Sequence, residues 1–220
     1  MDDVLEALGL TGRTVSTVEV DGRPARRTQV SRLYPTDAAD LWHALTDAER
    51  LPRWFLPISG DLREGGHYQF EGNAGGDVEL CEPPHRLRVT WGMGDAFPAT
   101  RLTVTLTTEQ QGTRLELDHV GEVPDELWDR FGPGATGVGW DLALHGLDLH
   151  ISSGADNDAQ LFATWTGSAE GVAFIRRSER AWCDADAASG TPVEEATARA
   201  ERTFAFYTGQ DTGQDAAPES

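Results

Sequence analysis

Residues 58–121 alternate between apolar and polar side chains, and this pattern constrains the fold more than any other feature of the chain. Since successive side chains of a strand point to opposite faces of its sheet, the pattern is typical of strands with one buried and one solvated face. Glycine and proline pairs supply turns around five such runs. Their apolar positions are Tyr68 and Phe70; Val78 and Leu80; Leu87, Val89 and Trp91; Leu102, Val104 and Leu106; and Leu115 and Leu117. The region predicts an antiparallel meander that is apolar on one side.

A hairpin and two helical segments precede the meander. Residues 15–20 and 24–34 flank Asp21-Gly22, a dipeptide typical of a tight hairpin turn. Helical spacing then begins after Thr36, which is the expected N-cap. A capping box over residues 46–49 predicts a second, short helix. We therefore expect the hairpin to add two strands to the sheet, and the two helices to follow the hairpin and precede the meander in the chain.

A long helix predicted over residues 137–151 can cover the apolar side of the sheet. One stripe with helical spacing consists of Trp140, Leu144, Leu147 and Ile151. A second stripe, almost opposite, consists of Val138, Leu142 and Leu149. A helix that is apolar on two sides needs a second partner besides the sheet.

The chain after this helix supplies that partner. Ser168 caps a predicted helix over residues 169–185, and Thr191 before Pro192 predicts another helix start. The apolar stripe of this last helix consists of Val193, Thr197, Ala200, Phe204 and Tyr207. We expect residues 152–208 to form a helical extension packed on the same domain, and residues 209–220 to be a disordered tail.

Composition limits the partners of the chain. Its 220 residues carry a formal net charge of −19, and every basic residue is arginine. Such acidity disfavours nucleic acid and anionic membranes, and no run approaches the ~20 apolar residues of a membrane span. The isolated Cys81 and Cys183 fit neither a disulfide framework nor a zinc site. Without a secretory signal at its start, the chain is expected to be cytoplasmic, without a cofactor, and to bind neither nucleic acid nor membrane.

Six segments occur in the order found in a known family. They are residues 39–47 (ADLWHALTD), 51–55 (LPRWF), 61–66 (DLREGG), 89–92 (VTWG), 112–119 (GTRLELDH) and 139–144 (GWDLAL). The chain thereby resembles the START-like (SRPBCC) superfamily, and specifically its branch of heat-shock ATPase-activator homologues. The resemblance implies an α+β helix-grip fold over residues 14–151, in which a curved antiparallel sheet wraps around a long C-terminal helix. It also implies a cavity between sheet and helix, which holds apolar molecules in the superfamily and is catalytic in only some members.

Three polar residues are candidates for catalysis. His119 continues the inward alternation of Leu115 and Leu117, which makes it a possible ligand contact or general base. The alternative is a hydrogen-bonded histidine near a strand end. Asp141 and His145 lie one turn apart on the long helix, where a carboxylate can orient an imidazole, and a local ion pair is the simpler interpretation. Because a third ligand is missing, no metal site is predicted.

The expected cavity wall combines aromatic and aliphatic side chains. Its predicted residues are Trp54, Phe70, Leu80, Trp91, Val104, Leu117, His119, Trp140 and Leu144. Filling of a solid core is the alternative role for the three tryptophans.

Three functions remain open. The first is non-catalytic binding of a small hydrophobic or aromatic molecule in the cavity. The second is an enzyme of the cyclase, dehydratase or hydrolase type that acts on an apolar substrate there. The third is a protein-interaction or chaperone-regulating module, which predicts an exposed apolar patch and a cavity below ~300 Å³.

Overall fold

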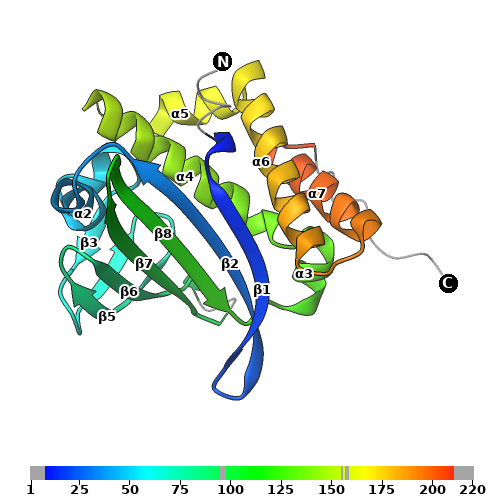
Figure 1. Ribbon diagram of the computed structural model, residues 1–220, viewed down its shortest axis with the longest axis horizontal. Helices are drawn as coiled ribbons and strands as arrows, with labels where there is room; N and C mark the ends of the chain where they lie inside the picture. The colour runs from blue at the N-terminus through cyan, green and yellow to red at the C-terminus, as the bar shows by residue number, and fades with distance from the viewer. Residues whose placement is uncertain (1–7, 95–97, 155, 157–158, 211–220) are drawn as a thin grey trace.

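The computed structural model describes residues 8–94, 98–154, 156 and 159–210. The strands are β1 (Gly12–Val20), β2 (Arg23–Tyr34), β3 (Ile58–Gly60), β4 (His67–Phe70), β5 (Gly75–Glu82), β6 (Arg86–Trp91), β7 (Thr100–Glu109) and β8 (Gly112–Gly121). The helices are α2 (Ala38–Thr46), the 3₁₀ turn η1 (Leu51–Arg53), α3 (Asp125–Phe131), α4 (Gly134–Ser153), α5 (Ala159–Thr166), α6 (Ala169–Ala188) and α7 (Val193–Tyr207). A curved sheet forms one layer, and helices α4 to α7 lie behind and beside it (Figure 1).

The eight strands form one antiparallel sheet in the order β1-β2-β8-β7-β6-β5-β4-β3. Each strand from β3 to β8 pairs with the next along the chain, so the predicted meander is confirmed. The first hairpin turns at Asp21 and Gly22, whose φ angles of 51° and 78° are those that a two-residue hairpin turn requires. β2 then pairs with β8, which places the first hairpin beside the end of the meander.

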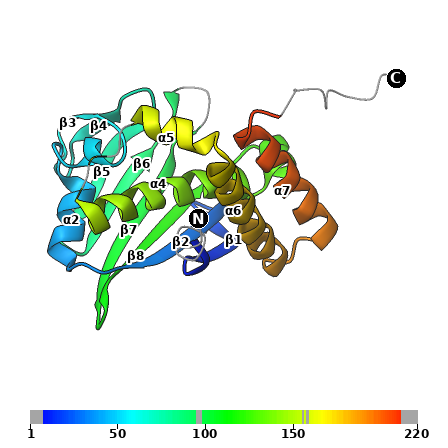
Figure 2. The same ribbon diagram turned by 90° about the horizontal axis from the view of Figure 1, so that it is seen from above.

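Helix α4 lies in the concave face of the sheet, which curves around it from β2 to β3 (Figures 1 and 2). Leu144 and Leu147 of α4 belong to one buried core with Leu102, Val104 and Leu115 of the sheet. This arrangement confirms the helix-grip, α+β fold. The helix begins at Gly134, slightly before the predicted start at residue 137.

Two helix starts differ from those predicted. The N-cap of α2 is Asp37, whose carboxylate accepts a hydrogen bond from the backbone N–H of Asp40, while the Thr36 hydroxyl donates to the Asp40 side chain. Thr46 is the last residue of α2, and its hydroxyl donates to the carbonyl of Trp42 instead of capping a new helix. Asp47 accepts from the backbone N–H groups of Glu49 and Arg50 in the turn that precedes η1, whose own N-cap residue, Arg50, makes no side-chain capping hydrogen bond. In both places an aspartate takes the role expected of the preceding threonine, since a carboxylate is a strong cap acceptor.

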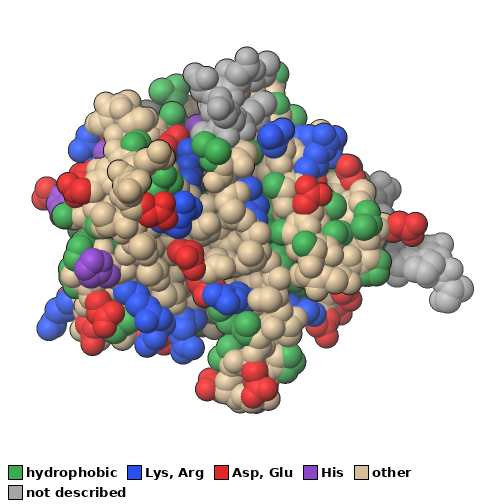
Figure 3. Space-filling model, viewed as in Figure 1, with side chains coloured by type: hydrophobic (Ala, Val, Ile, Leu, Met, Phe, Trp, Pro, Cys, Tyr) green, Lys and Arg blue, Asp and Glu red, His purple; other side chains and the backbone are tan. Residues whose placement is uncertain are grey.

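The convex face of the sheet carries paired charges. Glu79 accepts hydrogen bonds from Arg88 at 3.0 Å and from Arg101 at 2.8 Å. Asp118 accepts two from Arg27, at 2.8 and 2.7 Å. Figure 3 looks onto this face and shows arginine and acidic side chains close together over the strands. The face is therefore a solvated surface with locally balanced charge.

The side of α4 turned away from the sheet is covered by the C-terminal helices. Helix α6 packs against both α4 and β1, and α5 and α7 pack against α6. Ser168 caps α6 by accepting from the backbone N–H of Gly171, so the predicted cap is confirmed. On the second stripe of α4, Val138 is fully buried, whereas Leu149 is 38% exposed. The division into a domain of residues 14–151 and an extension of residues 152–208 remains a prediction.

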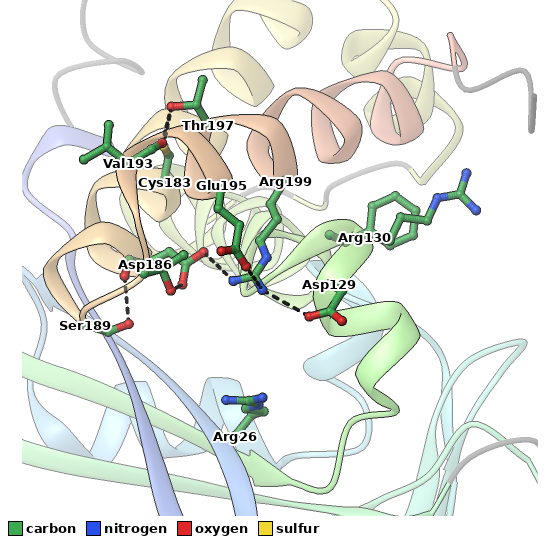
Figure 4. Close-up of polar contacts among 12 residues, drawn as sticks. Arg26, Asp129, Arg130, Cys183, Asp186, Ser189, Val193, Glu195, Thr197 and Arg199 are labelled. Atoms are coloured by element: carbon green, nitrogen blue, oxygen red, sulfur yellow. Dashed lines mark hydrogen bonds and ion pairs between the residues drawn. The ribbon is translucent and has the colours of Figure 1, made fainter. Parts of the chain in front are cut away.

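A buried arginine joins three of these helices. Arg199 of α7 lies between Asp186 of α6 and Asp129 of α3, with nitrogen–oxygen distances of 3.2 and 3.3 Å (Figure 4).

Thr191 does not cap α7 as predicted, because its hydroxyl donates to Asp186. The predicted stripe of α7 is confirmed at Ala200 and Phe204, which are buried, and wrong at Val193, which is 68% exposed; the buried face also includes the polar residues Arg199 and Thr203. Arg199 and Thr203 are buried through an ion pair and a hydrogen bond, and such residues leave no mark in a pattern of apolar positions.

Gly137 allows α6 to approach α4 closely. A Cβ atom at this position would lie 2.2 Å from Cε2 of Trp182. In an exposed helix, Gly→Ala stabilises a protein by about 1 kcal/mol. Here we expect Gly137→Ala to lower the free energy of unfolding by about 1–2 kcal/mol, because overpacking outweighs the helix propensity. Urea denaturation measures the change. Trp182→Leu is itself destabilising, because Trp182 is buried and donates to Asp141, but in that background Gly137→Ala should cost less than in the original chain, since the clashing ring is gone. A more stable single variant would contradict the close packing.

None of the helices in the described part of the chain is long and apolar enough to span a bilayer. The predicted disordered tail, residues 209–220, falls almost entirely outside the described residues, which end at Gln210.

Candidate functional site

A cavity of about 110 Å³ lies between the concave face of the sheet and α4. Its lining is aliphatic on β5 to β8 and aromatic near η1, β4, β6 and α4. The lining residues are Leu45, Thr46, Leu51, Trp54, Phe55, Ile58, Leu62, Tyr68, Phe70, Val78, Leu87, Val89, Trp91, Leu102, Val104, Leu115, Leu117, Trp140, Ala143 and Leu144. None of them is charged, so the cavity can hold an apolar group without burying an ion.

Aromatic rings form a continuous part of this wall. The Trp91 and Trp140 rings are 5.1 Å apart between centroids, and Phe70 lies 5.8 Å from Trp91. Phe55 meets Phe70 edge to face at 5.0 Å. Each of these rings is thus packed against at least one aromatic neighbour, which limits its movement.

The cavity brings together seven of the residues proposed from the sequence. These are Trp54, Phe70, Trp91, Val104, Leu117, Trp140 and Leu144. Their part in binding a ligand remains a prediction. Sequence reasoning missed several other lining residues, among them Phe55, Leu62 and Ala143. Phe55 and Leu62 follow the short turn η1 and strand β3, where neither a helical nor a strand period runs long enough to orient a side chain.

Leu80 does not line the cavity, because β5 contains an irregularity. The pairing with β6 shifts between Val78 and Leu80, so that Val78 lies opposite Val89 and Leu80 lies opposite Arg88. An extra residue of this kind reverses the faces of the strand beyond it. Cys81 accordingly packs on the core side, opposite Leu87. The expectation that Leu80 faces inward is therefore wrong.

His119 lies beside the cavity and is absent from its lining. Its Nδ1 accepts a hydrogen bond from Nε1 of Trp140 at 3.1 Å, and its Nε2 is 2.6 Å from the hydroxyl of Thr100. Since Nδ1 accepts, the neutral ring carries its proton on Nε2 and donates to Thr100, which in turn donates to the Trp91 carbonyl at 2.9 Å. Burial lowers the pKa of His119 to about 4, although the nearby Asp118 opposes the shift. The arrangement matches the alternative of a hydrogen-bonded histidine near a strand end.

Asp141 does not pair with His145. Its fully buried carboxylate accepts two hydrogen bonds from Arg13 of β1, at 3.1 and 2.9 Å. Two residues of α6 also donate to it, Ser178 at 2.5 Å and Trp182 at 3.0 Å. Burial raises the pKa of Asp141, and these donors oppose the rise. The carboxylate therefore ties β1, α4 and α6 together on the side of α4 away from the cavity.

His145 packs among aromatic rings on the same outer side. Its ring centroid lies 5.0 Å from that of Trp165 and 5.2 Å from that of Phe174. Burial lowers the pKa of His145, and the positive charge of Arg32 adds to the effect. The predicted Asp141–His145 pair is thus wrong, because the sequence gives no sign that the two side chains have other partners. Among the described residues, no group of three His, Cys, Asp or Glu side chains comes together as a metal site.

Comparison with known proteins places this geometry in a family. The family profile described as Activator of Hsp90 ATPase homolog 1-like protein matches residues 35–151. None of the curated proteins matches the chain.

Solved structures agree with this match. The crystal structure of CalU16 from Micromonospora echinospora has a TM-score of 0.63 at 31% identity, and the match covers 80% of this chain and 97% of CalU16. Its solution NMR structure has a TM-score of 0.61 at 26% identity, covering 92% and 96%. DynU16, from the dynemicin biosynthetic locus, has a TM-score of 0.51 at 23% identity, covering 59% of this chain and 48% of DynU16, and this likeness concerns the fold alone. Since the profile covers more than half of the chain and CalU16 is similar over nearly its whole length, the chain belongs to the family of Activator of Hsp90 ATPase homolog 1-like proteins, within the START-like superfamily.

Proposed function

We propose that this protein binds a small apolar molecule in the cavity between the sheet and α4, without catalysing a reaction. The observation that carries the proposal is the cavity wall, which is built from aliphatic and aromatic side chains and contains no charged residue. Apolar pockets with few polar groups are typical of sites for small hydrophobic ligands.

The polar residues near the cavity support binding over catalysis. General acid–base catalysis needs a titratable group within hydrogen-bond reach of the substrate. His119 has both ring nitrogens engaged by Trp140 and Thr100, and Asp141 is held by Arg13 on the other side of α4. The enzymatic alternative therefore lacks a free acid or base at the cavity wall within the described residues.

The volume of the cavity favours a second candidate. At about 110 Å³ it is smaller than the ~300 Å³ at which ligand pockets usually begin, as a protein-interaction module predicts. That function also predicts a contiguous exposed apolar patch. The exposed large apolar side chains of the described residues instead belong to several parts of the fold: Leu10 before β1, Met93 after β6, Leu127 on α3, Leu149 on α4, Leu161 on α5, and Val193 and Phe206 at opposite ends of α7. Ligand binding is therefore the better supported of the two.

Filling the cavity tests the proposal. Ala143 lines the cavity from α4 and is half-buried, so Ala143→Leu should place a larger side chain into it. We expect the variant to bind toluene at least tenfold more weakly than the original chain, because the probe and the leucine compete for one volume. Isothermal titration measures both affinities, and circular dichroism verifies the fold.

Ala135→Leu is the matched control, because Ala135 lies on the same helix and is exposed. It should leave the affinity for toluene unchanged within threefold. If toluene fails to bind the original chain, or binds all three proteins equally, the proposed site is wrong.

A further inference from the structure

We propose that the cavity selects an uncharged single ring, or a compact alkyl group of that size, that carries no hydrogen-bond acceptor. This inference rests on the proposed binding function and goes further by naming the chemical class of the ligand. It follows from two features of the wall: its volume and the state of its hydrogen-bond donors.

The volume limits the ligand to about one ring. An apolar cavity of ~150 Å³ in another protein is large enough for benzene. The cavity here measures about 110 Å³ and is bounded by buried strands on one side. A fused-ring or long-chain molecule would either extend out of this volume into solvent or require the wall to move, whereas a single ring needs only small adjustments of half-buried lining side chains such as Trp54 and Phe55.

Four of the five side-chain donors of the wall already donate to other groups of the protein. The Thr46 hydroxyl donates to the carbonyl of Trp42 at 2.8 Å, and the Tyr68 hydroxyl donates to the carbonyl of Thr90 at 2.7 Å. The indole N–H of Trp54 donates to the carbonyl of Ala44 at 2.8 Å.

The indole N–H of Trp140 donates to His119 at 3.1 Å, so it is engaged as well. Among the described residues, the indole of Trp91 is the one side-chain donor of the wall without such a partner, and this residue is only half-buried. A carbonyl or carboxylate oxygen taken into the cavity would therefore lose its water and find at most this one indole N–H, which a half-buried side chain can also donate to solvent.

The charge of the protein also disfavours ligands that carry a carboxylate. The wall offers no cation to a carboxylate, and the chain as a whole carries a net charge of −19. An anionic ligand would lose its hydration and also be repelled by the field of the protein. Fatty acids and other ligands that must bury a carboxylate are thus disfavoured.

A matched pair of probes tests the inference on the full chain. Styrene and benzaldehyde have nearly the same shape, and they differ in a terminal CH₂ against a carbonyl oxygen. We expect styrene to bind and benzaldehyde to bind at least tenfold more weakly, with benzoate showing no saturable binding up to a hundredfold higher concentration. Isothermal titration at neutral pH measures the three affinities, and Ala143→Leu identifies the binding that occurs in the cavity.

The outcomes separate this inference from the function on which it rests. If benzaldehyde binds as tightly as styrene, Trp91 or another group is donating to the ligand, and the inference is overturned while the binding function stands. If benzoate binds saturably and Ala143→Leu abolishes that binding, the inference is likewise overturned while the binding function stands. If none of the probes binds, or if Ala143→Leu changes no affinity, the proposed function itself fails.

Discussion

Replacing Arg13 with leucine is expected to lower the free energy of unfolding by about 3–5 kcal/mol, because the substitution leaves a buried carboxylate without its cation. Arg13 donates two hydrogen bonds to Asp141, and the two side chains are 6% and 0% exposed. Ser178 and Trp182 would still donate to the carboxylate, yet neither is charged. The variant should therefore take up a proton at Asp141 or unfold at lower denaturant concentration.

Urea denaturation followed by circular dichroism measures the effect. The double variant Arg13→Leu with Asp141→Leu should be more stable than Arg13→Leu alone, because removing both charges is less costly than isolating one. Arg27→Leu is the matched control, since Arg27 makes a similar two-bond contact with Asp118 on the solvated face. We expect it to cost less than about 1 kcal/mol. Equal losses for Arg13→Leu and Arg27→Leu would show that the buried pair is not a principal contact of the fold.

Lowering the pH from 7 to 4 is expected to remove about 3 kcal/mol of stability through His119 alone. At pH 7 the imidazole is largely neutral in both the folded and the unfolded chain. Below about pH 6.5 the unfolded chain takes up a proton, whereas the folded chain does so only near its pKa of about 4. In this window the unfolded state binds more protons, so stability falls as the pH falls. A difference of about 2.5 pKa units at 1.36 kcal/mol each gives the expected size.

His119→Gln isolates this contribution from that of other titrating groups. A glutamine amide can accept from Trp140 and donate to Thr100, as the neutral imidazole does, but it does not titrate. We expect the variant to lose about 3 kcal/mol less than the original chain between pH 7 and pH 4, as measured by urea denaturation at each pH. Burial also lowers the pKa of His145, which should account for part of the dependence that remains. Identical pH profiles for the two proteins would contradict the neutral, buried state of His119.

The sheet, the long helix and most of the cavity wall could be predicted from the sequence because they follow from periodicity. Regular alternation placed Phe70, Val104 and Leu117 on one face, and the structure finds them around one cavity. The same rule failed at Leu80, because the irregularity in β5 shifts the pairing by one residue and leaves no mark in the pattern of apolar residues.

The partners of the polar residues could not be predicted. Asp141 lies one helical turn from His145, yet it binds Arg13, which is 128 residues away in the chain. Spacing in the sequence identifies only residues that are neighbours on one helix or strand. The hydrogen-bond partner of a buried charge depends instead on which elements pack together in the folded protein. The volume of the cavity was also beyond prediction, since it depends on how the side chains of many elements fill the space between sheet and helix.

Helix α4 carries the cavity wall and the buried ion pair on adjacent residues. Trp140 and Ala143 line the cavity, and Asp141 between them is hydrogen-bonded to Arg13 of β1 and Ser178 of α6. If the turn of α4 around Asp141 moved away from the sheet, the cavity would become larger. The same movement would stretch the hydrogen bonds of Asp141 to Arg13 and Ser178. We therefore expect the contacts of α4 with β1 and α6 to limit the volume that the cavity can reach, so that weakening them would enlarge the cavity before it alters the shape of the sheet.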